Sequence, residues 1–220
     1  MLLRAPGFDA LTLPQLRHGF TTRAGGVSEG SFASLNVSAK RGDAPERVEE
    51  NLRRIAEAGD FLRGHLRRVR QVHGAACLRA CDLQPNSEAD AIWMARADGP
   101  GVVSVTTADC VPILLVDAAG EFAAAVHSGW RGTVANIVEA TVALLAKHGA
   151  LRSSLRAAIG PCIYQDAFEV GEEVAEHFDA RYVAREGYAK PHVDLVGVVR
   201  DQLLAAGLAV LLARRLAAPV

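Results

Sequence analysis

Three short motifs end in side chains that bind metals: QVHG contains His73, TADC contains Cys110 and VHSGWRG contains His127. Two imidazoles and one thiolate are a natural donor set for zinc, and three protein ligands leave the fourth position for water or substrate. Such a site lowers the pKa of a bound water to about 7 and polarises an attached oxygen. Copper also accepts these ligands, but neither Met1 nor Met94 stands where a weak axial ligand is expected. The motifs therefore predict a zinc centre, with copper as the alternative.

Each of these residues also has an ordinary explanation when it is taken alone. A histidine at a strand end is commonly a satisfied rim residue, and a lone buried cysteine usually behaves as a small hydrophobic residue. The spacing favours a site, because two apolar runs, 111–116 and 121–126, flank the turn 117–120 and predict a hairpin. In a symmetric hairpin Cys110 faces His127, with Cβ atoms about 4.5–5.5 Å apart. That distance suits two ligands of one metal ion.

Residues beside these motifs are candidates for catalysis and binding. Asp109 could orient a ligand or act as a general base; the alternative is a carboxylate that only shapes a turn. Residues 129–133 enter a predicted helix, whose N-terminus favours anions, and Arg131 would add a bidentate donor for phosphate. The alternative is that Trp130 belongs to the core and Arg131 to the surface. Cys162, in a Gly-Pro-Cys turn, could bring a second thiol to the pocket.

Apolar patterns predict the elements that must position these residues. They indicate strands over 66–72, 75–80, 102–106, 111–116, 121–126 and 155–160, and helices over 44–58, 133–148, 166–178 and 193–206. Asp43 is expected to cap the first helix, and Pro112 predicts that its strand is bulged or at a sheet edge. The long Gly- and Ser-rich loop 19–42 holds Arg23 and Asn36 and is the candidate wall or lid of a pocket. The mixture predicts an α+β fold, a layered α/β sandwich with a mixed β-sheet, as a single domain over residues 1–220.

Composition limits the partners of the chain. Its 220 residues carry a formal net charge of −1, and no basic stripe indicates a nucleic-acid partner. No apolar segment reaches the length of a membrane span, and no signal peptide is indicated, so we expect a cytoplasmic protein. In that compartment the four cysteines, at positions 77, 81, 110 and 162, are expected to be reduced thiols. The sequence does not indicate an oligomeric state.

Five motifs in order along the chain resemble the laccase-domain family. They are HGFTTRAGGVSEGSFASLN (18–36), RQVHG (70–74), TTADCVPILL (106–115), AVHSGWRG (125–132) and AIGPCIYQDAFEVG (158–171). Members of this family have been described as multicopper polyphenol oxidoreductases, peptidoglycan editing factors and purine nucleoside phosphorylases. The resemblance covers most of the chain, from about residue 18 to 171.

The resemblance implies a compact α/β sandwich that acts on purine nucleosides. Implied activities are the phosphorolysis of adenosine, inosine, guanosine and methylthioadenosine, and the deamination of adenosine, so the partners would be a nucleoside and phosphate. It also implies zinc on the three residues named above, and a pocket lined by the motifs that contain Arg23, Gln71 and Arg131. The sequence departs from the family at Ser128, where alanine is more usual. Its end, GLAVLLARRLAAPV, lacks the Cys-Thr and aromatic–Arg–Arg segments with which members usually finish.

Three other functions compete with the nucleoside phosphorylase. A cytoplasmic hydrolase could edit peptidoglycan precursors with the same site. A protein with a decayed pocket could bind or assemble without catalysis. A copper-dependent polyphenol oxidase is less favoured, because one three-ligand site cannot supply the several copper ions of a true laccase.

Overall fold

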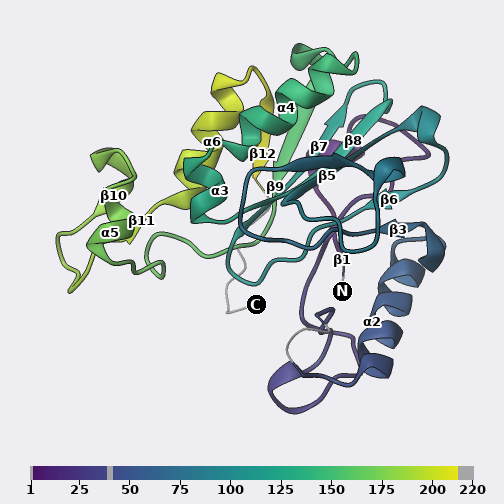
Figure 1. The fold of residues 1–220 in the computed structure, drawn as a ribbon, viewed down its shortest axis with the longest axis horizontal. Coiled ribbons are helices and arrows are strands. Elements are labelled where there is room, and N and C mark those ends of the chain that lie inside the picture. Colours follow the sequence, from purple (N-terminus) through teal and green to yellow (C-terminus); the bar gives the residue numbers. More distant parts are fainter. Residues whose placement is uncertain (1, 39–41, 213–220) are drawn as a thin grey trace.

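A six-stranded mixed sheet forms the centre of the computed structural model, which describes residues 2–38 and 42–212 (Figure 1). Its strands are β4 (Cys77–Arg79), β5 (Ala91–Ala95), β7 (Val111–Asp117), β8 (Phe122–Ser128), β9 (Leu155–Ile159) and β12 (Ala209–Leu212). They lie in the order β12-β9-β7-β8-β5-β4. The two outer pairs, β12–β9 and β5–β4, are parallel, and the inner pairs are antiparallel. The predicted mixed sheet is therefore confirmed.

Shorter elements surround this sheet. Three two-stranded ladders pair β1 (Leu2–Leu3) with β2 (Phe20–Thr21), β3 (Leu66–Arg67) with β6 (Val102–Val103), and β10 (Val183–Ala184) with β11 (His192–Val193). The helices are α1 (Pro6–Asp9), α2 (Pro45–Ala58), α3 (Trp130–Val134), α4 (Ile137–Lys147), α5 (Glu172–Ala175) and α6 (Leu195–Ala205). None of the helices in the described ranges has the length and apolar character that crossing a membrane requires.

Alternation along the central strands explains the layers. Ile113 and Leu115 of β7 share a buried cluster with Val142 of α4 and Leu203 of α6, which cover one face of the sheet together with α3 (Figure 1). Leu114, one residue out of phase, packs on the opposite face with the buried Ile92. Both faces of β7 are therefore covered, which explains its almost continuous apolar sequence. The expected layered sandwich is confirmed.

The central hairpin differs from the prediction in its register. Val116 pairs with Ala123, and His127 pairs with Pro112, so Cys110 is not the direct cross-strand partner of His127. The slip arises at Asp117, whose carboxylate accepts the N–H groups of residues 119 and 122 and lengthens the turn on the β8 side. Because the slip is two residues, Cys110 and His127 stay on the same face of the sheet.

The expectation that Pro112 marks an edge or bulged strand is wrong. β7 lies between β8 and β9, in the middle of the sheet. Pro112 is tolerated there because it is the second residue of β7, and its partner strand β9 ends at Ile159. Its carbonyl oxygen accepts the N–H of Gly160 at 2.9 Å. The proline therefore lacks its N–H donor only where the ladder between β7 and β9 already ends.

Two predicted helices are also corrected. The helix expected over 133–148 is divided into α3 and α4 by Asn136, which has a left-handed φ of +53° and whose side chain accepts the N–H of Glu139. The helix expected over 166–178 is reduced to α5, because residues 169 and 170 pair instead with the segment before α6. Asp43 does not cap α2, which begins after Ala44; its carboxylate accepts hydrogen bonds from two loop residues instead.

Several strands differ in length or were not predicted. The strands expected over 66–72, 75–80 and 102–106 are limited to β3, β4 and β6. β5 was not predicted, because its sequence AIWMA is apolar throughout and has no period that marks a strand. Of the atypical C-terminal sequence, β12 is described and residues 213–220 lie outside the described residues.

Candidate metal centre

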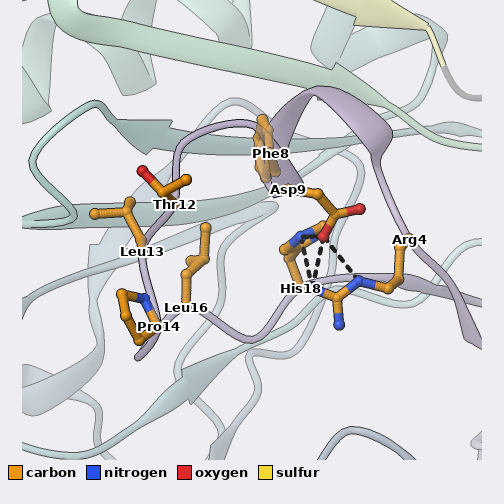
Figure 2. Close-up of a pocket in the computed structure, with 8 residues that line it drawn as sticks. All are labelled: Arg4, Phe8, Asp9, Thr12, Leu13, Pro14, Leu16 and His18. Carbon is orange, nitrogen blue, oxygen red and sulfur yellow. Dashed lines mark hydrogen bonds and ion pairs between the residues drawn. The ribbon is translucent and has the colours of Figure 1, made fainter.

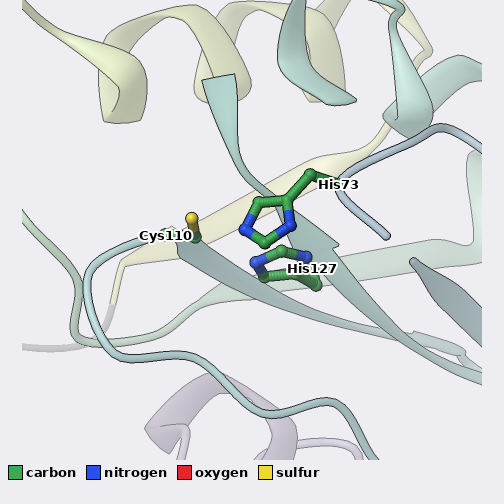
Figure 3. Close-up of side chains that lie close together, drawn as sticks. All are labelled: His73, Cys110 and His127. Carbon is green, nitrogen blue, oxygen red and sulfur yellow. The ribbon is translucent and has the colours of Figure 1, made fainter. Parts of the chain in front are cut away.

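The side chains of His73, Cys110 and His127 converge at the open end of the central hairpin (Figure 3). One ligand atom from each residue, a ring nitrogen or the thiol sulfur, lies within 4.8 Å of the other two. The two imidazole rings meet edge to face, with their centroids 4.9 Å apart. The three motifs thus meet in space, and their side chains could hold a metal ion with the donor set that zinc accepts.

Each of the three ligands has a different backbone setting. His127 is the penultimate residue of β8 and is only 3% exposed, so the sheet fixes its position. Cys110 immediately precedes β7 and is half-buried. His73 lies on an exposed loop with a left-handed φ of +62°, a conformation that costs a non-glycine residue about 1–2 kcal/mol. The third ligand therefore depends on whatever holds this loop.

Asp90, fully buried and just before β5, holds that loop. Its carboxylate accepts the N–H groups of Val72 (3.2 Å), His73 (2.9 Å) and Gly74 (2.7 Å). One of the same carboxylate oxygens lies 2.8 Å from Nδ1 of His127, and the main-chain oxygen of Asp90 accepts the His127 N–H at 2.7 Å. Asp90 therefore connects two of the three candidate ligands.

Asp90 is not among the residues that the sequence motifs predicted. The signal that could have found it is a lone carboxylate between Ala89 and the apolar run 91–95, all of which is predicted to be core. A buried carboxylate without partners is very unfavourable, so its presence in such a run indicates hydrogen-bond donors that come from elsewhere in the chain.

The two glycines of the SGWRG segment keep the centre open. A Cβ at Gly129 would lie 3.1 Å from Sγ of Cys110 and 3.1 Å from Cδ2 of His73. A Cβ at Gly132 would lie 2.8 Å from the carbonyl oxygen of Gly74, beside the His73 loop. Bare backbone at both positions therefore lets the start of α3 approach all three ligands.

Burial dominates the electrostatics of the ligands. Desolvation raises the pKa of the Cys110 thiol, and the negative charges of Asp109 and Asp90 raise it further. Desolvation lowers the pKa of His127, against the opposing effect of Asp90. Without a metal the centre thus favours a neutral thiol and a neutral imidazole, and a metal that binds here displaces the thiol proton.

Arg131 lies beside the centre in sequence, but its side chain stacks on its neighbour. Its guanidinium carbon is 4.4 Å from the centroid of the Trp130 ring, and the same ring stacks on the imidazole of His177 with the two centroids 5.8 Å apart. Arg131 is exposed. The helix that it enters, α3, is only five residues long, so an anion here would rely on the guanidinium more than on a helix terminus.

Asp109 and Cys162 lie on two segments that meet beside Cys110. The carbonyl oxygen of Asp109 accepts the N–H of Ile163 at 2.8 Å. Burial raises the pKa of Cys162 to about 12, with smaller contributions from Asp194 and Cys110. The Asp109 side chain is exposed. The structure thus brings the predicted second thiol next to the metal-binding segment.

Gln71 uses its side chain to hold the backbone before Cys110. Its amide nitrogen donates to the carbonyl oxygen of Thr106, and its amide oxygen accepts the Thr106 N–H, both at 2.8 Å. Gln71 thereby fastens the His73 loop to the segment that leads into Asp109 and Cys110.

Arg23 and Asn36 are engaged within the long N-terminal loop. Both Nε and Nη2 of Arg23 donate to the carbonyl oxygen of Ala33. Asn36 donates to Asp43 at 2.9 Å and to the carbonyl oxygen of Ser38. No contact among the described residues brings these two side chains to the three ligands, so their binding roles remain predictions.

A separate pocket of about 250 Å³ lies near the N-terminus and shares no residue with the metal centre (Figure 2). Its polar groups are satisfied by one another, since Asp9 accepts from Arg4 at 2.6 Å and lies 3.2 Å from Nε2 of His18. Phe8 packs edge to face on His18. The charged side chains of this pocket are paired and the rest of its lining is mostly apolar, whereas the metal centre presents ligand atoms that face one another.

Comparison with known proteins identifies the family. The profile of the family described as multi-copper polyphenol oxidoreductase laccase matches residues 17–214. A protein of Deinococcus radiodurans named purine nucleoside phosphorylase is 41% identical over 213 residues, which cover 93% of this chain and 81% of that protein. A protein from an unknown prokaryotic organism, named adenosine deaminase RL5, is 35% identical over 85% of this chain and 77% of its own length. The crystal structure of Neisseria meningitidis protein NMB0706 superposes with a TM-score of 0.79 at 31% identity, over 90% of this chain and 81% of that one. This chain belongs to the multi-copper polyphenol oxidoreductase laccase family.

Proposed function

We propose that this chain is a zinc-dependent purine nucleoside phosphorylase that also deaminates adenosine. The expected phosphorolysis substrates are adenosine, inosine, guanosine and methylthioadenosine. The observation that carries the proposal is the convergence of His73, Cys110 and His127 in a chain similar over 93% of its length to a protein named purine nucleoside phosphorylase. The similarity to a protein named adenosine deaminase supports the second reaction.

The three side chains fit zinc by their chemistry. Two imidazoles and a thiol within 4.8 Å match a three-ligand catalytic site, and the glycine at position 129 leaves the space beside them free. When bound there, zinc supplies Lewis-acid activation of water or of a substrate oxygen. Within residues 2–38 and 42–212 this is the one such group of three ligands, whereas polyphenol oxidation with several copper ions would need more.

The two reactions place different demands on the protein. In phosphorolysis a phosphate oxygen forms a bond to the anomeric carbon, the glycosidic C–N bond breaks, and the departing purine must gain a proton. In deamination water adds at C6 of adenine, and the amino group leaves as ammonia after it gains a proton. Asp109, exposed beside Cys110, is assigned to hold and transfer that proton.

Arg131 is assigned to the phosphate. Its present contact with Trp130 is an exposed cation–π interaction, worth about 0.5–1 kcal/mol. A charge-assisted hydrogen bond to an anion contributes about 1.5–3 kcal/mol. The guanidinium would therefore leave the indole ring and bind an incoming phosphate.

Nucleoside binding is assigned to Arg23, Asn36, Gln71 and Cys162. Arg23 and Asn36 hold backbone groups of their own loop, and Gln71 holds the backbone of Thr106. All three can support the pocket wall without any movement and reach the substrate only if these segments rearrange. Cys162 is half-buried next to Cys110 and offers a neutral thiol surface on which a purine base can pack.

The test is an assay with zinc-loaded protein. Incubation with inosine should yield hypoxanthine only when phosphate is added, and incubation with adenosine should yield inosine, both followed by chromatography. Protein stripped with a chelator and assayed in parallel should lose both reactions, and zinc should restore them. Zinc-loaded protein that converts no purine nucleoside would refute the proposal and favour a peptidoglycan-precursor hydrolase or a binding protein.

A further inference from the structure

We propose that Asp90 is the positioning residue of this centre: its carboxylate sets the tautomer of His127 and fixes the loop that presents His73. The inference rests on the proposed function in so far as these residues bind zinc. It concerns a residue that is no ligand itself and that the ligand motifs do not contain.

Three backbone N–H groups and one imidazole nitrogen converge on the Asp90 carboxylate. Oδ1 receives the backbone N–H of His73 at 2.9 Å and faces Nδ1 of His127 at 2.8 Å. Oδ2 receives the backbone N–H groups of Val72 at 3.2 Å and Gly74 at 2.7 Å. Because three of the four partners can only donate, the carboxylate acts as an acceptor throughout. Asp90 is 0% exposed, so water does not compete for these bonds.

The consequence for His127 is a defined tautomer. With a carboxylate oxygen opposite Nδ1, that nitrogen carries the hydrogen and donates it to Asp90. The lone pair is then on Nε2, the nitrogen left to face Cys110 and His73 (Figure 3). A carboxylate behind a ligating histidine also makes the imidazole a better donor to a metal.

The consequence for His73 is a loop held in an unfavourable conformation. Its left-handed φ of +62° is a conformation that a residue with a Cβ atom rarely adopts. Three backbone hydrogen bonds to one charged acceptor stabilise the loop in spite of this conformation. Without Asp90 we expect the loop to relax and to move the His73 ring away from Cys110.

Replacing Asp90 by asparagine removes the charge and changes the hydrogen-bonding groups, but it keeps the size of the side chain. Asparagine can offer its oxygen to only one side of this arrangement. If its NH₂ group faces Val72 and Gly74, two donors oppose it and the loop opens. If it faces His127, Nδ1 must become the acceptor and the hydrogen moves to Nε2, the atom needed for the metal. Either orientation damages one of the two histidine ligands.

Asp117 provides a matched control. It is also buried, at 6% exposure, and its carboxylate also accepts backbone N–H groups, from Ala119 and Phe122, but at the far end of the hairpin. Asp90→Asn and Asp117→Asn therefore change the same group in similar surroundings. Only the first change should affect the metal centre.

The experiment measures zinc affinity by competition with a chromophoric chelator, and the tautomer of His127 by ¹⁵N–¹H NMR of the metal-free protein. Asp90→Asn should lower zinc affinity by about 10–100-fold, the effect typical of groups that orient metal ligands, and Asp117→Asn should leave it unchanged. In the metal-free wild-type protein, Nδ1 of His127 should carry the hydrogen.

Two results would overturn the inference. One is an Asp90→Asn protein that binds zinc as tightly as the wild type. The other is a metal-free wild-type protein in which Nε2 of His127 is protonated and Nδ1 is not, a measurement that remains decisive if the variant fails to fold. A wild-type protein that binds no zinc would refute the proposed function instead, and the His127 tautomer would still decide the role of Asp90.

Discussion

Gly129 brings the main chain of the strand-to-helix turn against the thiol of Cys110, so closely that a methyl group on its Cα would lie 3.1 Å from Sγ. The same methyl group would lie 3.7 Å from Cε1 of His127. One wall of the metal centre is therefore bare backbone. This explains why the sequence follows His127 and Ser128 with a glycine before it places the bulky Trp130.

Gly129→Ala should weaken metal binding without unfolding the protein. Gly129 has an ordinary φ of −75°, so the backbone accepts alanine, but the added methyl group must displace the thiol or the His73 ring. We expect about a tenfold loss of zinc affinity, the lower end of the range for groups that orient ligands. Gly64→Ala, where a Cβ meets nothing within 4 Å, is the control. Equal zinc affinity of the two variants would contradict this account.

Cys110→Ala should remove the metal, whereas Cys81→Ala should not. Cys110 supplies the thiol of the centre, and Cys81 is exposed with its thiol directed to Asp82. Elemental analysis of the purified proteins should find zinc in the wild type and in Cys81→Ala, and little in Cys110→Ala. Undiminished zinc in Cys110→Ala would remove that residue from the centre.

Arg131→Ala should raise the KM for phosphate by about ten- to hundredfold, the equivalent of one lost charge-assisted hydrogen bond. Arg181→Ala is a close control, because Arg181 is also exposed and its guanidinium carbon lies 4.6 Å from the centroid of the Tyr182 ring. Steady-state kinetics with varied phosphate would distinguish the two. A rise in KM for the nucleoside alone would place Arg131 elsewhere in the pocket.

Asn51→Ala should destabilise the protein by loosening the long N-terminal loop. Asn51 is 0% exposed, and its side-chain oxygen accepts the N–H of Val27. Its side-chain NH₂ group donates to the hydroxyl of Ser28 and to the carbonyl oxygens of Ser34 and Asn36. Truncation leaves several buried groups without partners, so we expect a loss of about 2–3 kcal/mol in the free energy of unfolding.

Urea unfolding would measure this loss. Glu57→Ala, on the exposed side of α2, should change the free energy of unfolding by no more than about 0.5 kcal/mol. A similarly small effect at Asn51 would show that the loop does not depend on this side chain.

The carboxyl group of Asp43, which holds the same loop, should make the stability of the protein depend on pH. Hydrogen bonds, first from Ser28 and then from Asn36, hold the pKa of Asp43 below its ordinary value of 3.8. A carboxyl group with a lower pKa in the folded state stabilises the protein above the unfolded pKa, and the contribution is lost as the pH falls through the folded pKa. Asp43→Asn should therefore be less stable than the wild type at pH 6.

The stability difference between Asp43→Asn and the wild type should shrink as the pH falls below about 4. Urea unfolding at several pH values from 6 down to 3 would test this. Asp60→Asn, which alters an exposed carboxyl group paired with Arg17, should follow the wild type. A constant difference between Asp43→Asn and the wild type across this range would contradict the expectation.

The local sequence pattern of the central hairpin predicted its strands but not their register. Two apolar runs and an Asp/Gly turn were enough to predict β7 and β8, and with them a shared face for Cys110 and His127. The register could not be predicted, because it depends on how the Asp117 side chain closes the turn. A symmetric turn and the observed one differ by two residues, a shift that keeps every side chain on its face.

The break between α3 and α4 shows the opposite case. The apolar period over 133–148 is continuous, so nothing in the pattern marks Asn136 as a break. In the fold, Gln202 of α6 donates to the carbonyl oxygen of Thr133 at 2.8 Å and Asn136 caps a new helix. A contact across 69 residues of sequence thus accompanies a local cap at this boundary.

By itself, the sequence determined the types of the three candidate ligands, the mixed sheet and the family. The residue types define the ligand chemistry, the apolar periodicity indicates the sheet, and the order of the motifs indicates the family. Only the tertiary structure decided that Asp90 stands behind two of those ligands. Its partners lie 16 to 37 residues away, and a buried carboxylate is tolerated only where distant donors are brought to it. Such an arrangement is a property of the folded chain, since no short segment of the sequence contains both the acceptor and all its partners.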